Sequence, residues 1–166
     1  MPELESLLER LIRHDVELVI VGGFAALAHG VSLMTEDIDI CCPFAEGNLR
    51  KLEQAIADLH PVHRMTPNRL PFQLAPELLP ALKNLYLRTD LGILDCLSNV
   101  KGLGDYPAVK EVSIPVELPI GTCRLLSIEA LIKAKEAMGG PRDKETILQL
   151  KAIQERNKPS GGALNP

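Results

Sequence analysis

The chain has 166 residues, of which 46% are apolar and 24% charged, and its net charge is −4. This length is typical of one domain, and the apolar content excludes intrinsic disorder for most of the chain. The negative charge argues against a broad phosphate-binding surface, and 3% aromatic residues without tryptophan argue against a base-stacking platform. No run approaches the ~18 apolar residues of a membrane span, and the acidic N-terminus is unlike a secretory signal.

Hydrophobic periodicity predicts helices and strands that alternate along the chain. Leucines at positions 4, 7, 8 and 11 recur at helical spacing, and glycine or proline marks the ends of most later elements. In chain order we expect a helix over 3–13, a strand over 17–22, a helix over 24–29, a strand over 37–42, a helix over 47–59, strands over 83–89, 92–97, 111–118 and 121–126, and helices over 127–138 and 142–155.

This order predicts one α+β domain over residues 1–156, in which a mixed β-sheet is flanked by helices and C-terminal helices follow. Residues 61–80 contain five prolines and are expected to be mostly loop, because proline interrupts both ladder and helix hydrogen bonds. The polar segment 157–166 is expected to be a disordered tail.

Four cysteines lie in apolar stretches without a C-x-x-C motif. This usage predicts buried, reduced thiols in a cytoplasmic protein rather than a zinc site or a disulfide framework. They are Cys41, Cys42, Cys96 and Cys123.

Asp37 and Asp39 form the sharpest chemical signal in the chain. Alternate residues of a strand share a face, so both carboxylates point the same way while Ile38 and Ile40 enter the core. Two carboxylates on one rigid face suit a hard cation such as Mg²⁺. A polar outer face on an edge strand is the alternative interpretation of the same pattern.

Two further features give this pair a context. Gly22-Gly23 ends the preceding strand and opens a short helix, and the backbone amides of such a turn bind phosphate well. Asp95 lies inside the otherwise apolar strand 92–97, where a carboxylate is either exposed at an edge or functional. The P-loop, the dinucleotide fingerprint, the nucleophile elbow and the H-E-x-x-H motif are all absent from the sequence.

The runs VGGFAALAHG (21–30) and TEDIDI (35–40) together resemble the signature of minimal nucleotidyltransferases of the DNA polymerase β-like superfamily. The run LIKAKEAMGGPRD (131–143) is similar to the helical motif of the group related to abortive-infection toxin nucleotidyltransferases. The chain departs from that group at Leu33 and Gly140, where arginine is common.

The resemblance implies a site for a nucleoside triphosphate and two Mg²⁺ ions. Asp37, Asp39 and Asp95 would be the metal ligands and, with Lys135, the catalytic residues; Asp95 would also help to deprotonate the acceptor hydroxyl. The nucleotide-binding residues would be Gly22, Gly23, Thr35 and Lys135.

Charged residues outside the aspartates leave alternatives open. Lys135 shares a helix face with apolar residues, so it either extends past that face to solvent or points at a phosphate. Asp143 lies in the first turn of the last helix, where we expect it to cap the helix or to interact favourably with the helix dipole. Four basic residues surround the proline-rich segment, and they form either a solvated surface or the rim of an acceptor site. They are Arg64, Arg69, Lys83 and Arg88.

We therefore expect a Mg²⁺-dependent nucleotidyltransferase that transfers NMP from an NTP to a hydroxyl of RNA, protein or a small molecule. The resemblance also implies the toxin of a toxin–antitoxin pair, with a small protein as a partner. The alternative is a catalytically inactive module that binds a nucleotide or a partner, which the residues Leu33 and Gly140 favour.

Overall fold

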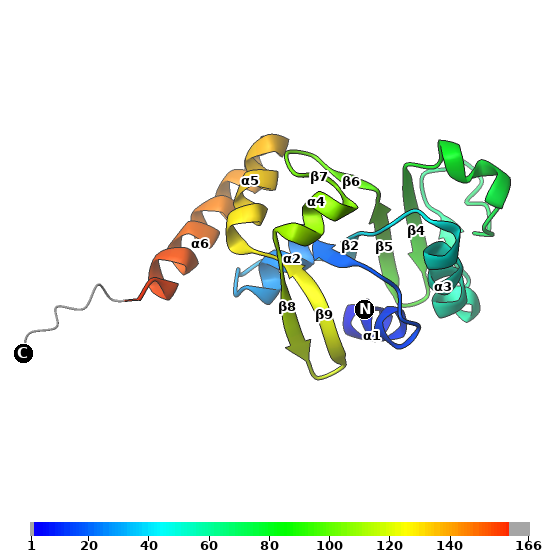
Figure 1. Ribbon diagram of the computed structural model, residues 1–166, viewed down its shortest axis with the longest axis horizontal. Coiled ribbons are helices and arrows are strands. Elements are labelled where there is room, and N and C mark those ends of the chain that lie inside the picture. Colours follow the sequence, from blue (N-terminus) through cyan, green and yellow to red (C-terminus); the bar gives the residue numbers. More distant parts are fainter. Residues whose placement is uncertain (1, 160–166) are drawn as a thin grey trace, which may run out of the picture.

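The computed structural model describes residues 2–159 of the chain (Figure 1). The helices are α1 (Leu4–Arg13), α2 (Gly22–Ala28), α3 (Glu46–Ile56), α4 (Tyr106–Glu111), α5 (Ile128–Met138) and α6 (Pro141–Asn157). The strands are β1 (Val19–Val21), β2 (Asp37–Cys41), β3 (Val62–His63), β4 (Asn84–Thr89), β5 (Gly92–Leu97), β6 (Asn99–Val100), β7 (Gly104–Asp105), β8 (Ser113–Leu118) and β9 (Gly121–Leu126). Short 3₁₀ turns cover Ala57–Leu59 and Pro76–Ala81.

One mixed sheet organises the fold. Its seven strands follow the order β3-β4-β5-β2-β1-β9-β8. The β2–β5 and β1–β9 pairs are parallel, and the other neighbouring pairs are antiparallel. β2 is the middle strand of this order, so the interpretation of the D-x-D pattern as the outer face of an edge strand is wrong.

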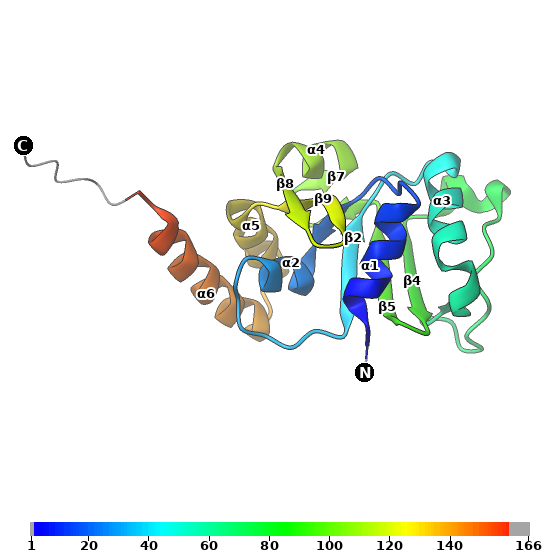
Figure 2. The same cartoon turned by 90° about the horizontal axis from the view of Figure 1, so that it is seen from below.

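Helices α1 and α3 lie side by side against the sheet (Figure 2). Leu7, Leu8 and Leu11 of α1 are fully buried, because leucines three and four residues apart form one apolar stripe. Ile38 and Ile40 of β2 are also fully buried, and they alternate with the aspartates along the strand. The aspartate side chains therefore point to the opposite face of the sheet.

The C-terminal helices form an antiparallel pair next to α2 (Figure 1). The Ser127 hydroxyl accepts from the Ala130 amide at 3.2 Å and caps α5, while Gly139 ends that helix with φ +70°. α6 begins at Pro141, and its Asp143 carboxylate accepts from the Gly140 amide at 3.1 Å. The expectation that Asp143 caps the last helix is confirmed.

The α+β class and the mixed sheet flanked by helices are confirmed, and most element boundaries agree within a few residues. The segment 61–80 is mostly loop as expected, although it contains the two-residue strand β3. Two other expectations fail in detail. Strand 17–22 ends at Val21 because Gly22 opens α2. Helix α4, whose Asp105 carboxylate accepts from the Ala108 amide at 3.3 Å, was not expected, and the strand expected from residue 111 begins at Ser113.

Helix α6 extends to the start of the segment that was expected to be a tail. Of the tail expected over 157–166, Asn157 is the last residue of α6, and residues 160–166 lie outside the described part. All four cysteines are buried free thiols, as their apolar surroundings predict. Over residues 2–159, every helix is too short or too polar to cross a membrane.

Candidate active site

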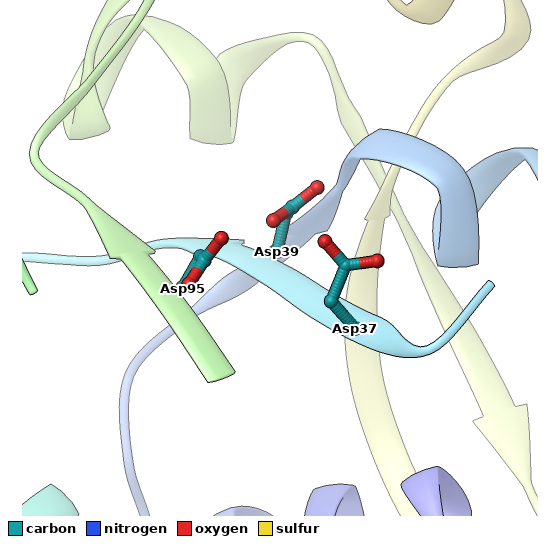
Figure 3. A group of neighbouring side chains, drawn as sticks. All are labelled: Asp37, Asp39 and Asp95. Atoms are coloured by element: carbon teal, nitrogen blue, oxygen red, sulfur yellow. The ribbon is translucent and has the colours of Figure 1, made fainter. Parts of the chain in front are cut away.

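The three aspartates expected to act together do lie together. One carboxylate oxygen from each of Asp37, Asp39 and Asp95 falls within 4.8 Å of the others. In the parallel β2–β5 pair, Asp39 is directly opposite Asp95, and Asp37 is two residues earlier on β2. Figure 3 shows all three carboxylates on the same side of the sheet. We call this group the aspartate triad.

The triad concentrates negative charge at a poorly solvated place. Only 6% of Asp95 is exposed, and burial raises the pKa of Asp39 to about 7 from an ordinary value of 3.8. Burial is the largest cause of this rise, the negative charges of Asp37 and then Asp95 contribute to it, and Lys135 and Arg64 act in the opposite direction. Without a bound cation, Asp39 thus loses its proton only near neutral pH. A cation would favour the ionised form at lower pH.

The glycine turn lies directly against the triad. Val21 is opposite Asp39 in the antiparallel β1–β2 pair, and Gly22 follows it with φ +69°. A β-carbon on Gly22 would overlap the Asp39 carboxylate, so glycine is required both by the backbone conformation and by the close approach. The amides that open α2 are therefore brought next to a carboxylate of the triad.

Thr35 precedes β2 and contacts its first aspartate. The Thr35 hydroxyl lies 2.9 Å from Asp37 Oδ1 and 3.0 Å from the Asp37 carbonyl oxygen, either of which accepts its proton. This contact orients the Asp37 side chain at the entrance of the strand. Gly23 faces Thr35 across the same turn.

A cavity of about 170 Å³ connects the triad to the C-terminal helices. Its lining includes Gly22, Asp39, Lys135 and Asp143. Lys135 Nζ is 3.3 Å from Asp143 Oδ1, and both side chains are 19% exposed. Lys135 therefore points into the cavity that contains Asp39, rather than extending past the helix face into solvent.

A second and more open cavity, of about 1000 Å³, lies at the Asp37 end of the triad. Thr35, Leu33 and Arg142 line it together with Asp37. Arg142 is on the first turn of α6, one residue before Asp143. A cationic side chain thus reaches the cavity although positions 33 and 140 carry no arginine.

Arg64, which the sequence placed either on a solvated surface or at the rim of an acceptor site, binds a carboxylate of the triad, and this contact was not predicted. Its Nε donates to Asp95 Oδ1 at 3.0 Å and its Nη2 donates to Oδ2 at 2.5 Å. The interpretation of Arg64 as part of a solvated surface is wrong, whereas Arg69, Lys83 and Arg88 are exposed as expected. No local pattern marks Arg64, because it lies 31 residues from Asp95 in the chain.

The triad fits a divalent metal ion. Its ligand atoms are carboxylate oxygens, which Mg²⁺ prefers, and they converge from rigid neighbouring strands. Three such groups repel one another without a cation, and this repulsion adds to the burial that raises the pKa of Asp39. Phosphate binding is compatible with the adjacent helix start and Lys135.

No protein-family model matches the chain, and no curated protein matches its sequence. Solved structures are similar in fold. The lincosamide antibiotic adenylyltransferase LnuA, with lincomycin bound, has a TM-score of 0.61 at 18% identity over 91% of this chain and 96% of its own. ANT(2")-Ia in complex with adenylyl-2"-tobramycin has a TM-score of 0.55 at 14% identity over 92% and 93%.

A Thermotoga maritima protein that is provisionally named a nucleotidyltransferase has a TM-score of 0.53 at 19% identity over 92% of this chain and 91% of its own. These similarities extend over nearly the whole described chain. The chain therefore has the nucleotidyltransferase fold, and the aspartate triad lies on the middle strands of that fold.

The raised pKa of Asp39 predicts a pH dependence of stability in metal-free protein. In the folded protein Asp39 keeps its proton up to about pH 7, whereas in the unfolded chain it loses the proton near pH 3.8. Ionisation of Asp39 therefore costs the folded state nothing below about pH 4 and its full free energy above about pH 7. The free energy of unfolding should fall across this window by up to roughly 4 kcal/mol. Urea unfolding with EDTA should show this fall in the wild type and a flatter profile for Asp39→Asn; parallel profiles would contradict the assignment.

The close approach at the glycine turn predicts different outcomes for neighbouring glycines. Gly22→Ala should destabilise the protein by about 1–3 kcal/mol, since it strains a positive φ and collides with Asp39. Gly23→Ala is the matched control, because a β-carbon there meets Thr35 Oγ1 at an ordinary 3.5 Å. Chemical denaturation of both variants should separate them; equal stabilities would show that the turn relaxes.

Proposed function

We propose that this chain is a nucleotidyltransferase that transfers NMP from an NTP to an acceptor hydroxyl with the help of Mg²⁺. The observation that carries the proposal is the convergence of Asp37, Asp39 and Asp95 beside the Gly22 turn. This arrangement combines a cation site with backbone amides suited to phosphate. The similarity in fold to nucleotidyltransferases supports the same conclusion.

Each aspartate has a role in this proposal. Asp37 and Asp39 would hold two Mg²⁺ ions, and Asp95 would hold one of them and accept the proton of the attacking hydroxyl. When bound, the ions would neutralise the phosphate charge and stabilise the attacking and leaving oxygens. The attacking oxygen forms a bond to the α-phosphorus, the bond to the pyrophosphate oxygen breaks, and pyrophosphate leaves.

The phosphate chain would be bound along the glycine turn, which extends from the Asp39 cavity to Thr35. Gly22 and Gly23 would offer backbone amides there, Thr35 would offer its hydroxyl, and Lys135 would exchange its ion pair with Asp143 for a phosphate oxygen. Arg142 would supply charge from the neighbouring cavity. Its position supports activity despite Leu33 and Gly140.

A small hydroxylated molecule is the acceptor class that we favour. The names of the similar structures describe a lincosamide adenylyltransferase and a protein bound to an adenylylated tobramycin. The net charge of −4 also disfavours an extended RNA surface. The open cavity of about 1000 Å³ beside Asp37 has the volume of a small-molecule site.

The role of a toxin, with RNA or protein as the acceptor and a small protein as the partner, is the second candidate. It is supported by the resemblance of residues 131–143 to the toxin-type group and by Lys135 and Asp143 of that motif, which line the cavity at Asp39. An inactive nucleotide-binding module is the third, and Leu33 and Gly140 are the residues that favour it.

Nucleotide binding should raise the melting temperature only when Mg²⁺ and an NTP are present together. At a hundredfold excess over Kd, ligand binding adds about 2.7 kcal/mol, which corresponds to roughly 5–10 °C for a domain of this size. Melting of the wild type should therefore rise with at least one Mg·NTP and much less with Mg²⁺ or NTP alone. Asp39→Ala should lose this shift without melting lower when metal-free, because a repelling charge is removed.

Transfer assays with labelled NTPs then distinguish the candidates. Label on aminoglycoside or lincosamide acceptors supports the favoured class, and label on total RNA or protein supports the toxin. A Mg·NTP shift without transfer to any acceptor supports the inactive module. No shift with any of the four NTPs would contradict nucleotide binding altogether.

Lys135 provides a test of the phosphate end with a close control. Lys135→Ala should raise the Kd for Mg·NTP by about tenfold, since a charge-assisted hydrogen bond contributes about 1.5–3 kcal/mol. Lys133→Ala on the same helix removes an exposed lysine outside the cavity and should leave the Kd unchanged. Calorimetric titration checks both; a lower melting temperature with unchanged affinity would show that Lys135 is structural.

A further inference from the structure

Arg64 binds both oxygens of the most buried triad carboxylate. Its Nε–Oδ1 distance to Asp95 is 3.0 Å and its Nη2–Oδ2 distance is 2.5 Å, a two-point contact. The side chain of Asp95 is 8% exposed and that of Arg64 is 26% exposed. Among residues 2–159, Arg64 is the cationic residue that hydrogen-bonds to the triad.

The backbone of Arg64 is fixed, whereas its outer nitrogen is weakly bound. The Arg64 amide donates to the Tyr86 carbonyl oxygen at 3.0 Å, and Tyr86 is opposite Asp95 in the β4–β5 pair. The guanidinium carbon lies 5.3 Å from the centre of the Tyr86 ring. Nη1 donates to Met65 Sδ at 3.3 Å, and Met65 is 66% exposed. The backbone at Arg64 is thus held by a contact that does not depend on the pairing of its side chain with Asp95.

The contact makes Arg64 a substitute for a bound cation. A guanidinium beside a carboxylate compensates its charge, as a divalent ion would. A Mg²⁺ ligand must approach the ion to about 2.0–2.1 Å. An ion that approached Asp95 so closely would meet the positive charge of Arg64 on the same carboxylate, and the two cations would repel each other.

We infer that Arg64 is a positioning residue that holds Asp95 in the metal-free protein and exchanges with a divalent cation, so that the two compete for this carboxylate. The inference rests on the metal site of the proposed function. Arg64 keeps the Asp95 carboxylate oriented and its charge compensated before the ion arrives. When Arg64 releases Asp95, both carboxylate oxygens become free to bind the metal ion and the acceptor hydroxyl. The guanidinium can then still stack against the Tyr86 ring.

Arg64→Met tests the competition directly. It keeps an unbranched side chain of moderate length and removes the charge. A neighbouring cation lowers the proton affinity of a carboxylate by about tenfold or more, and the same repulsion acts on a metal ion. We therefore expect Mn²⁺ alone to bind Arg64→Met about tenfold more tightly than wild type, by calorimetric titration of the full chain. In EDTA the variant should melt lower than wild type.

Two further variants control the experiment. Arg88 is exposed on β4, two residues from Tyr86 and so on the same strand face, and Arg88→Met should leave Mn²⁺ affinity at the wild-type value. Arg64→Lys keeps a charge but offers one compact donor group instead of a fork, so its Mn²⁺ affinity should lie between wild type and Arg64→Met. If Arg64→Met does not fold, Arg64→Lys alone decides the question by the same comparison.

The outcomes separate this inference from the proposed function. Wild-type binding of Mn²⁺ with equal or weaker binding by the Arg64 variants would overturn the competition and leave the proposed function standing. An equal gain in Arg88→Met would also overturn it, because the effect would be general charge rather than contact with Asp95. Absence of Mn²⁺ binding in wild type and variants alike would overturn the competition, whereas the proposed function is decided separately by the Mg·NTP melts.

Discussion

The repulsion among three carboxylates is the constraint on which the site depends. Asp37, Asp39 and Asp95 would separate if their backbones were free, because like charges within 4.8 Å disfavour one another in a buried place. The parallel β2–β5 pairing prevents this by placing Asp39 directly opposite Asp95 in the middle of the sheet. The isoleucines that alternate with the aspartates secure the strand from the other face. A stable core thus maintains an unfavourable arrangement of charges.

The surroundings of the triad compensate this repulsion incompletely. Arg64 binds Asp95, and Lys135 lies in the cavity of Asp39 but is itself paired with Asp143. Among residues 2–159, none forms an ion pair with Asp39, and burial with the charges of Asp37 and Asp95 raises its pKa to about 7. Such a site lowers the free energy of unfolding relative to a protein with neutral side chains at these positions. Binding of a positively charged ligand would raise that free energy again. The remaining need for positive charge is what gives the site affinity for a cation.

The similar solved structures show how little sequence this fold requires. Identities of 14–19% accompany coverage of more than nine tenths of the chain. Apolar patterns are satisfied by many residues, so the core tolerates extensive change. At the site, positions 33 and 140 carry leucine and glycine rather than arginine. Arg142 nevertheless brings a positive charge to the cavity that Leu33 lines.

The sequence by itself determined the features that depend on local periodicity. Strand alternation places Asp37 and Asp39 on one face, and the glycine pair marks the turn that opens α2. Only the tertiary structure decided that β2 is central, that Asp95 lies opposite Asp39, and that Arg64 binds it. These relations depend on strand order and register, which are set by packing among segments far apart in the chain. Arg64 illustrates the reason, because a side chain in a proline-rich segment finds its partner through the β3–β4–β5 neighbourhood rather than through any spacing in the sequence.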